Sequence, residues 1–183
     1  CISTHAVANE YDYFTAVADL QNEDNTGAGH LGTVEFNSAT LYRYANVAVP
    51  ELYAELGENP ASLGRAVAEF ARAFISSMPT GKQNTFANYT VPDAVIVSLR
   101  SDRPINLAGA FEEPVKKVAE EGYKTKSVKA LIKYANEVYS DFADKPAKTY
   151  VIGSNLDVMG EKVNLADLLT RLDNDMQKFA KNE

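Results

Sequence analysis

Strand-like and helix-like patterns alternate between residues 33 and 100, and this order constrains the fold more than any other feature of the chain. Residues 33–49, TVEFNSATLYRYANVAV, show the apolar alternation of a β-strand. The alternation slips in phase near Asn37 and Ser38, as a bulge between two halves of a strand requires. We expect the half that contains Arg43 to lie antiparallel to a neighbouring strand.

A helix and a second strand follow. Asn59 is a good N-cap, and Pro60 suits the first helical position. Apolar residues then recur at three- and four-residue steps, and they are Leu63, Val67, Phe70, Phe74 and Met78. After a loop, AVIVSLR at residues 94–100 is typical of a buried strand. Strand, helix and strand in this order predict half of a split βαβ sheet within an α+β fold.

The last third of the chain is predicted to be mainly helical and to add a second apolar layer. We expect a short helix over residues 111–121, a short strand over 149–153, and a last helix that Asn164 caps. The clearest amphipathic stripe comprises Val128, Leu131, Ile132, Ala135, Val138, Tyr139 and Phe142. With 183 residues and no internal repeat or linker, the chain is predicted to form a single domain.

The charge is acidic and unevenly distributed. The net charge is −7, and the first sixty residues hold nine acidic side chains against one basic side chain, Arg43. An acidic chain binds phosphate backbones poorly, so a nucleic-acid role would depend on local groups. No apolar run reaches the roughly 20 residues that span a bilayer. A single cysteine allows no disulfide within a monomer, which agrees with a cytoplasmic protein.

The chain begins at Cys1, which leaves two interpretations open: a processed N-terminus or part of a longer chain. A first cysteine whose α-amino group serves as base, with His5 and His30 available, would define an N-terminal nucleophile amidohydrolase. A cut within a longer chain would also leave Cys1 as the first residue. The amidohydrolase is therefore kept as the alternative function. Two histidines and one cysteine are too few for a zinc site, and we expect no metal and no other cofactor.

The loop after the helix contains PTGKQNTFANY at residues 79–89. Its Gly81-Lys82 pair matches a phosphate-binding loop only in part. Ser76 stands where the upstream glycine belongs, and Gln83 replaces the serine or threonine that would hold magnesium, so we discard ATP binding.

The same loop suits nucleic acid in another way. Lys82 can meet a phosphate, and the three polar residues after it can hydrogen-bond a sugar or a base: Gln83, Asn84 and Thr85. A solvated connection between helix and strand explains the loop equally well.

Tyr13 and Phe14 stand within an acidic stretch, DYFTAVADL, just before the glycine-containing run NEDNTGAGH. On a strand their side chains point to opposite faces, and one interpretation is an ordinary hairpin arm with both aromatics in a core. The other is an exposed pair on a long hairpin, which proteins use to stack on single-stranded bases or to wedge between them.

Four segments lie in collinear order along the chain: HAVANEYDYFTAVADL (5–20), HLGTVEFNSATLYRYANV (30–47), PTGKQNTFANY (79–89) and PDAVIVSLRSDRPINLAGAFEEPV (92–115). They resemble the CasC-type backbone subunit of type I-E Cascade, the CRISPR RNA-guided interference complex. The resemblance covers most of residues 1–115 and includes distinctive strings such as HLGTVEF and YRYAN. Beyond Val115 it weakens to a helical character.

This resemblance implies a modified RNA-recognition-motif (ferredoxin-like) palm, a thumb hairpin and C-terminal helices. The thumb would span residues 5–32, the palm strands and helix 33–115, and the helical part 116–183. It also implies a subunit without enzymatic activity that binds CRISPR RNA in antiviral defence. Copies polymerise head-to-tail along the guide, beside other Cascade subunits, and present the spacer for pairing with target DNA.

The resemblance also implies roles for particular residues. Tyr13, Phe14 and Thr15 would lie on the thumb against a flipped nucleotide and the adjacent subunit, and the loop around Lys82 and Gln83 would contact the RNA backbone.

Two departures from the family pattern matter. The family has tryptophan at the position of Tyr13, so the stacking surface is smaller here. Family chains are also longer and begin with the first palm strand, its helix and a fingers insertion. We therefore expect this chain to be a C-terminal portion that lacks the more basic half. On that interpretation Cys1 is a mid-chain residue, and the hydrolase loses its support.

Overall fold

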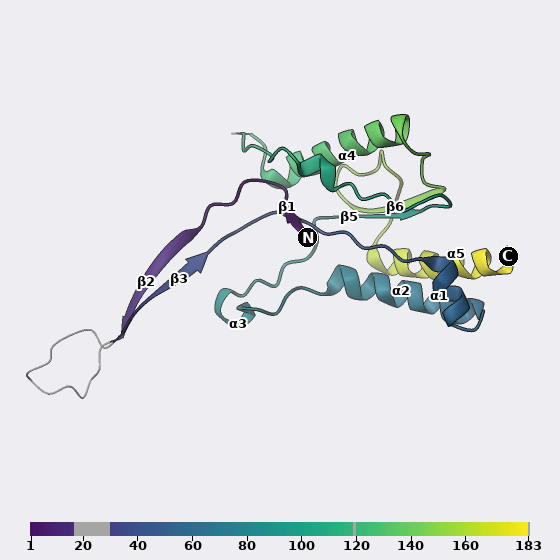
Figure 1. Ribbon diagram of the computed structural model, residues 1–183, viewed down its shortest axis with the longest axis horizontal. Helices are drawn as coiled ribbons and strands as arrows, with labels where there is room; N and C mark the ends of the chain where they lie inside the picture. The colour runs from purple at the N-terminus through teal and green to yellow at the C-terminus, as the bar shows by residue number, and fades with distance from the viewer. Residues whose placement is uncertain (17–29, 119, 183) are drawn as a thin grey trace, which may run out of the picture.

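The computed structural model describes residues 1–16, 30–118 and 120–182 and has a mixed α+β architecture (Figure 1). In its central sheet, β5 (Ala94–Leu99) lies antiparallel to β6 (Lys148–Gly153), and β6 lies parallel to the short β7 (Glu161–Lys162). Helices α2 (Pro60–Ser76) and α5 (Leu165–Asn182) cover one face of this sheet, and α4 (Tyr123–Asp141) covers the other. None of the helices in the described part of the chain has the length and apolar character that crossing a bilayer requires.

Side-chain alternation along β5 explains why both faces of the sheet are covered. Val95 and Val97 pack with the buried Leu168 on the side of α2 and α5. Ile96 packs with Val128 on the side of α4. A strand that is covered on both faces is mainly apolar, so the strand predicted from AVIVSLR is confirmed, although its residues are half-buried rather than buried.

Both predicted helix caps are confirmed. The Asn59 side chain accepts a hydrogen bond from the Ser62 N–H at 3.0 Å, and the Asn164 side chain accepts one from the Asp167 N–H at 2.8 Å. The strand predicted over 149–153 is confirmed as β6. The predicted amphipathic stripe lies on α4, except that Phe142 follows the helix and is exposed.

The predicted stripe on α2 is correct in its first half and wrong in its second. Leu63 and Val67 are buried, but Phe70 is exposed, and the buried line continues to Ile75 by four-residue steps. Phe70 and Phe74 stack on each other away from α5, with ring centroids 6.1 Å apart. In the predicted stripe the step after Val67 was three residues long and led to Phe70. The face of α2 that contacts α5 and the sheet continues from Val67 by four-residue steps instead.

The strand predicted over residues 33–49 is two strands in different sheets. β3 (His30–Phe36) pairs antiparallel with β2 (Glu10–Ala16), and β4 (Leu41–Tyr42) pairs antiparallel with β1 (Ile2–Ser3). The phase slip therefore marks a change of sheet rather than a bulge. Helix α1 (Val49–Glu55) begins where the strand was expected to end.

This division also affects the predicted split βαβ unit. Among the described strands, β4 before α2 and β5 after it belong to separate sheets, so the three elements share no single sheet. The expected antiparallel pairing is present in β4, but β4 ends at Tyr42 and Arg43 itself lies just outside it.

The helix predicted over residues 111–121 is wrong. A 3₁₀ turn, η1 (Ala108–Phe111), ends at Phe111, and the described residues after it form no helix before α4. Pro114 lacks a backbone N–H and disfavours a helical conformation for Glu113, which breaks the segment. Phe111 is buried against Leu131 and Ala135 of α4.

Strands β2 and β3 form a hairpin that projects away from the rest of the molecule (Figure 1). Its register pairs Tyr13 with Thr33 and Phe14 with Gly32. Strand β3 extends to Phe36, beyond the predicted limit of the thumb at residue 32. Residues 17–29, the remainder of that predicted hairpin, lie outside the described residues.

Asp175 links α5 to the central sheet. Its carboxylate accepts hydrogen bonds from the Tyr150 hydroxyl at 2.6 Å and from the Lys148 ammonium at 2.9 and 3.0 Å. Burial acts to raise the pKa of Asp175, but these hydrogen bonds and the charge of Lys148 hold that pKa below its ordinary value.

Replacing Asp175 with asparagine should lower the free energy of unfolding at neutral pH by about 1.5–3 kcal/mol, as expected for hydrogen bonds to a charged group. A carboxyl with a lowered folded-state pKa stabilises the fold above its unfolded value of about 3.9, and this contribution is lost as the pH falls below that value. Urea unfolding of wild type and Asp175→Asn across this range measures the difference.

Asp157→Asn is the matched control for this measurement. Its pair with Lys162, at 3.5 Å, is exposed on both sides and should contribute little at any pH. A loss in Asp175→Asn that stays constant down to strongly acid pH would show that the carboxylate charge is not responsible.

Candidate nucleic-acid interface

The hairpin carries an aromatic side chain on each of its two faces. Directly paired residues of an antiparallel pair share a face, so Phe14 lies with Gly32 and Tyr13 lies with Thr33 on the opposite side. The Tyr13 side chain is 71% exposed and the Phe14 side chain is 46% exposed. Neither aromatic is a core residue, so the interpretation of the pair as part of a packed core is wrong.

Gly32 makes room for the Phe14 ring. A β-carbon added at residue 32 would lie 2.3 Å from Phe14 Cζ, which is far inside van der Waals contact. The ring therefore lies across the backbone of β3, and any larger residue at position 32 would displace it. This contact holds Phe14 in place while nearly half of its surface stays open.

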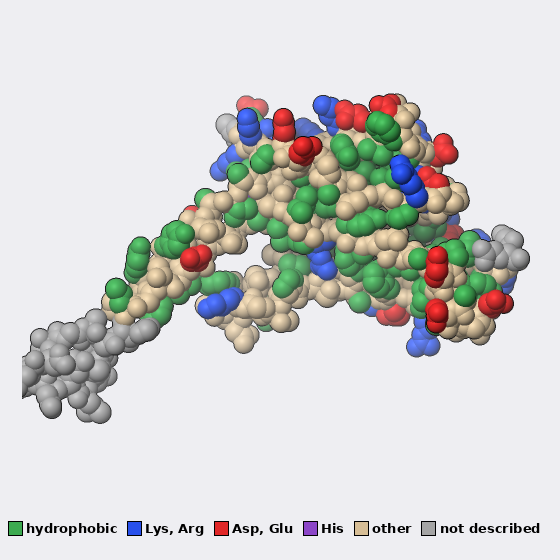
Figure 2. Space-filling model, viewed as in Figure 1, with side chains coloured by type: hydrophobic (Ala, Val, Ile, Leu, Met, Phe, Trp, Pro, Cys, Tyr) green, Lys and Arg blue, Asp and Glu red, His purple; other side chains and the backbone are tan. Residues whose placement is uncertain are grey.

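The Tyr13 face is an open apolar row. Tyr11, Tyr13 and Leu31 are exposed on it beside Thr15, the third predicted thumb residue. Hydrophobic side chains are spread along the projecting hairpin in Figure 2. The prediction from sequence missed Tyr11 and Leu31, although two-residue alternation from Tyr13 and its partner strand would have identified them.

The loop of residues 79–89 lies at the base of the hairpin. It contains the short helix α3 (Gln83–Phe86), and the Phe86 ring contacts the Phe36 ring of β3 with centroids 5.0 Å apart. Lys82 precedes α3 in a left-handed conformation, φ 59°, and its Nζ lies 5.9 Å from the centroid of the Phe86 ring. Phe36 and Phe86, which join the loop to the hairpin, were not predicted as site residues.

The two predicted groups of residues are near each other but not in one cluster. Lys82, Asn84 and Thr85 are exposed and Gln83 is half-buried. Phe36 is four residues from Gly32 along β3, which is about 14 Å in an extended strand. The structure therefore brings the loop to the base of the hairpin and leaves the aromatic pair further out.

Charge on the hairpin does not favour a phosphate backbone. Glu10 and Asp12 share the face of Phe14, and Glu35 lies on the face of Tyr13. The hairpin thus offers stacking surfaces, and Lys82 on the adjoining loop is an exposed cation near its base.

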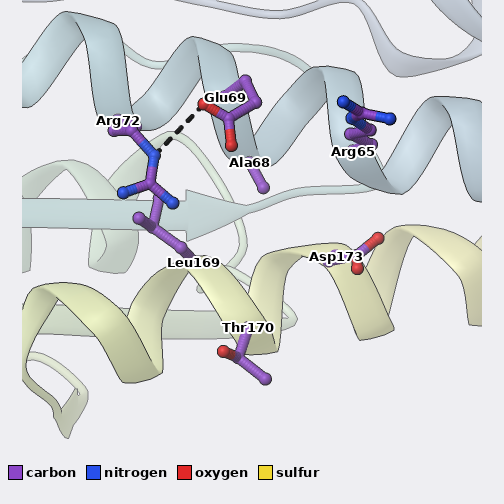
Figure 3. A pocket seen from close by; sticks show the side chains of 7 residues that line it. All are labelled: Arg65, Ala68, Glu69, Arg72, Leu169, Thr170 and Asp173. Atoms are coloured by element: carbon purple, nitrogen blue, oxygen red, sulfur yellow. Dashed lines mark hydrogen bonds and ion pairs between the residues drawn. The ribbon is translucent and has the colours of Figure 1, made fainter.

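A separate cavity of about 210 Å³ lies between α2 and α5 (Figure 3). Arg65 and Arg72 line it together with Glu69 and Asp173. Arg72 is paired with Glu69 at 3.1 Å, and both side chains are more than half exposed. Two guanidinium groups against two carboxylates make a balanced, solvated groove, so we assign no anion site to it.

Cys1 is exposed, but His5 is not available to it as a base. His5 Nδ1 lies 2.8 Å from the Ala6 carbonyl oxygen, and the Thr40 N–H donates to His5 Nε2 at 3.0 Å. Both ring nitrogens are thereby committed to hydrogen bonds with the backbone. The side chain of His30 is not among those that the structure describes.

Comparisons with known proteins agree with this architecture. The sequence model of the CT1975-like protein family matches residues 1–177. A solved chain of a "CRISPR RNA-guided surveillance complex" is similar with a TM-score of 0.80 and 33% sequence identity, over 92% of this chain and 67% of that chain. A chain of a "CRISPR RNA-guided surveillance complex, pre-nicking" is similar with a TM-score of 0.81 and 34% identity, over 95% of this chain and 48% of that chain.

This chain thus spans about two thirds of the first of these solved chains and about half of the second. Among curated proteins, none matches it by sequence. The four segments predicted a resemblance to CasC-type subunits of a CRISPR RNA-guided complex, and the family match and the two solved structures confirm it. The chain belongs to the CT1975-like protein family.

Proposed function

We propose that this chain is the C-terminal portion of the CRISPR RNA-binding backbone subunit of a type I-E Cascade complex. The observation that carries the proposal is the projecting hairpin with Tyr13 and Phe14 exposed on opposite faces. Its support is the similarity, at 33–34% identity, to chains of CRISPR RNA-guided surveillance complexes.

The chemistry of the hairpin suits a guide RNA of arbitrary sequence. Every base has a π-face, so stacking on an aromatic ring tolerates any spacer, whereas hydrogen-bond readout would not. In the proposed assembly, copies lie head-to-tail along the guide, and each hairpin stacks against a displaced nucleotide and the adjacent copy. The bases between hairpins remain open for pairing with target DNA.

The finer proposal for the fold is a modified RNA-recognition-motif palm of the ferredoxin-like type. Among the described strands, nothing pairs with the outer edge of β5. The sequence of β5, AVIVSL, contains no charge or proline of the kind that protects an open edge. In the proposed palm a further strand pairs there and extends the central sheet.

Reconstitution of the full-length protein with CRISPR RNAs of two spacer lengths tests the function. We expect assembly to require RNA, and the number of bound copies, measured by native mass spectrometry, to increase with spacer length. A copy number that is independent of RNA would indicate a protein-only scaffold and reject the proposal.

The proposal includes no enzymatic activity for this subunit, and the alternative is an N-terminal nucleophile amidohydrolase that uses Cys1. The commitment of His5 to backbone hydrogen bonds weighs against that alternative. Amide hydrolysis by the purified protein that disappears in Cys1→Ala would support the hydrolase and reject the backbone subunit.

Lys82→Ala in the full-length protein should weaken RNA binding about equally for all spacer sequences. If Lys82 neutralises one phosphate, the negative slope of log affinity against log salt concentration should become shallower by about 0.7–1. Alanine keeps the β-carbon of lysine, so the left-handed backbone at residue 82 gains no new strain. Filter binding at several salt concentrations measures the slope.

Lys133→Ala is the matched control, because Lys133 lies on α4 and its side chain is 80% exposed. An unchanged slope in Lys82→Ala, or the same reduction in both variants, would remove Lys82 from the interface.

A further inference from the structure

A buried polar network joins the root of the hairpin to the body of the molecule. Thr4, before the hairpin, donates its N–H to the Thr40 carbonyl, after the hairpin, at 2.9 Å. The Thr4 carbonyl accepts from the Val115 N–H at 2.9 Å, and the Thr4 and Ser127 hydroxyl groups share a hydrogen bond at 2.8 Å. The side chains of Thr4 and Ser127 are buried in this network.

His5 is the next residue, and it contacts two other segments of the chain as well as its neighbour Ala6. His5 is only 8% exposed. The Nε2 atom of its ring accepts a hydrogen bond from the Thr40 N–H at 3.0 Å, and the Nδ1 atom lies 2.8 Å from the Ala6 carbonyl oxygen. Its ring also stacks on Tyr123 in the first turn of α4, with centroids 3.8 Å apart and planes 12° apart.

These partners determine the protonation of the ring. The Ala6 carbonyl can only accept a hydrogen bond, so Nδ1 carries the proton and donates it. The Thr40 N–H can only donate, so Nε2 must be unprotonated. A proton on Nε2 would place two N–H groups against each other, and the network therefore requires the neutral Nδ1–H form.

The hydrogen bond from Thr40 to His5 lies at the root of the hairpin, so it influences the direction of the whole hairpin. Among the described residues, the bond from Thr40 to His5 is the last hydrogen bond between the two arms before the ladder that begins at Glu10 and Phe36. Seven-residue strands of about 24 Å lie beyond it. A small change at the root therefore becomes a large displacement of Tyr13 and Phe14.

We propose that neutral His5 is the positioning residue of the hairpin: its Nε2 holds the two arms together at the root, and its ring fixes them against α4. The direction in which Tyr13 and Phe14 project depends on this contact. The consequence for RNA binding rests on the proposed function, whereas the fixation of the hairpin does not.

Two variants in the full-length protein separate the acceptor from the ring. His5→Phe keeps a ring that can stack on Tyr123 and removes the acceptor, whereas His5→Gln removes the ring and keeps an amide oxygen that reaches toward the Thr40 N–H. Hydrogen–deuterium exchange of residues 37–42 in RNA-free protein reports on the root, and filter binding reports on CRISPR RNA. Tyr123→Phe, which retains the stacked ring, is the matched control.

In His5→Phe we expect exchange at the root to be about fivefold faster and RNA binding about fivefold weaker, the effect of losing one hydrogen bond of average strength. His5→Gln should restore most of both losses, and Tyr123→Phe should behave as wild type. In the wild type, ¹⁵N spectra of labelled histidine rings should show His5 protonated on Nδ1 alone, which does not depend on the stability of any variant.

Three results would overturn the proposal: wild-type exchange in a folded His5→Phe, no rescue by His5→Gln, or a proton on Nε2 in the spectra. A different pattern concerns the function of the hairpin. If exchange changes as expected while RNA binding stays at wild-type strength in both His5→Phe and Tyr13→Ala/Phe14→Ala, His5 positions the hairpin as proposed and the RNA-binding role of the hairpin fails.

Discussion

Alanine at both Tyr13 and Phe14 should abolish most guide-dependent assembly of the full-length protein and leave the RNA-free fold nearly unchanged. Stacking of one base on one aromatic ring is worth roughly 1–3 kcal/mol, or about 5- to 150-fold in affinity per contact. Each copy along the guide repeats the contact, so the losses accumulate over the assembly. The fold should tolerate the change because both side chains project from the hairpin, outside the buried clusters.

Single substitutions should then distinguish the two faces of the hairpin. Phe14→Ala removes the ring that lies across Gly32, whereas Tyr13→Ala removes the most open ring of the opposite face. Phe14→Tyr keeps the ring in the same place and should be mild. We expect Phe14→Ala to loosen guide-dependent assembly and target binding, with each loss measured by filter binding of the assembled complex.

Thermal melts of the RNA-free variants provide the control. Truncation of a buried phenylalanine to alanine would lower the free energy of unfolding by about 3–5 kcal/mol, and this loss would be visible without RNA. If the melting temperature of Phe14→Ala falls by that much while binding per folded molecule is unchanged, Phe14 supports the fold and does not contact RNA.

The helices were predictable because their determinants are local. Asn59 and Asn164 satisfy backbone N–H groups within three residues of themselves, so each cap can be recognised without knowledge of the tertiary structure. The face that a helix buries depends on its neighbours, which is why α2 buries Ile75 and exposes Phe70. Strand partners also depend on distant segments, and the two halves of residues 33–49 consequently pair in different sheets.

The candidate site was predictable in its exposed residues and not in its organisation. Tyr13, Phe14 and Lys82 could be identified from motifs within short segments. The contact of Phe36 with Phe86 joins residues fifty positions apart, and no local pattern indicates it. His5 was considered only as a histidine available beside a Cys1 nucleophile, whereas its burial against Tyr123 and its bond from Thr40 arise only in the folded chain.

Gly64→Ala should lower the stability of the fold through the addition of a single methyl group. Gly64 is buried where α2 faces α5, and a β-carbon there would lie 2.0 Å from Asp173 Oδ1 and 2.7 Å from the Asp173 carbonyl oxygen. The carboxylate can rotate away, but the carbonyl is part of the α5 backbone, so the two helices must separate. Overpacking of this kind costs about 1–3 kcal/mol.

In an unobstructed helix a glycine-to-alanine substitution is stabilising, so propensity and clash predict opposite effects at Gly64. Alanine in an unobstructed helix gains about 1 kcal/mol over glycine, so propensity alone predicts a rise in melting temperature for Gly64→Ala. The clash predicts a fall, by about 2–4 °C for each kcal/mol in a protein of this size. Gly81→Ala is the matched control, because a β-carbon at residue 81 meets nothing within 4 Å. A Gly64→Ala protein that melts at or above the wild-type temperature would show that α2 and α5 can separate without cost. In that case the close approach at Gly64 would not hold Leu63 and Val67 against Met176.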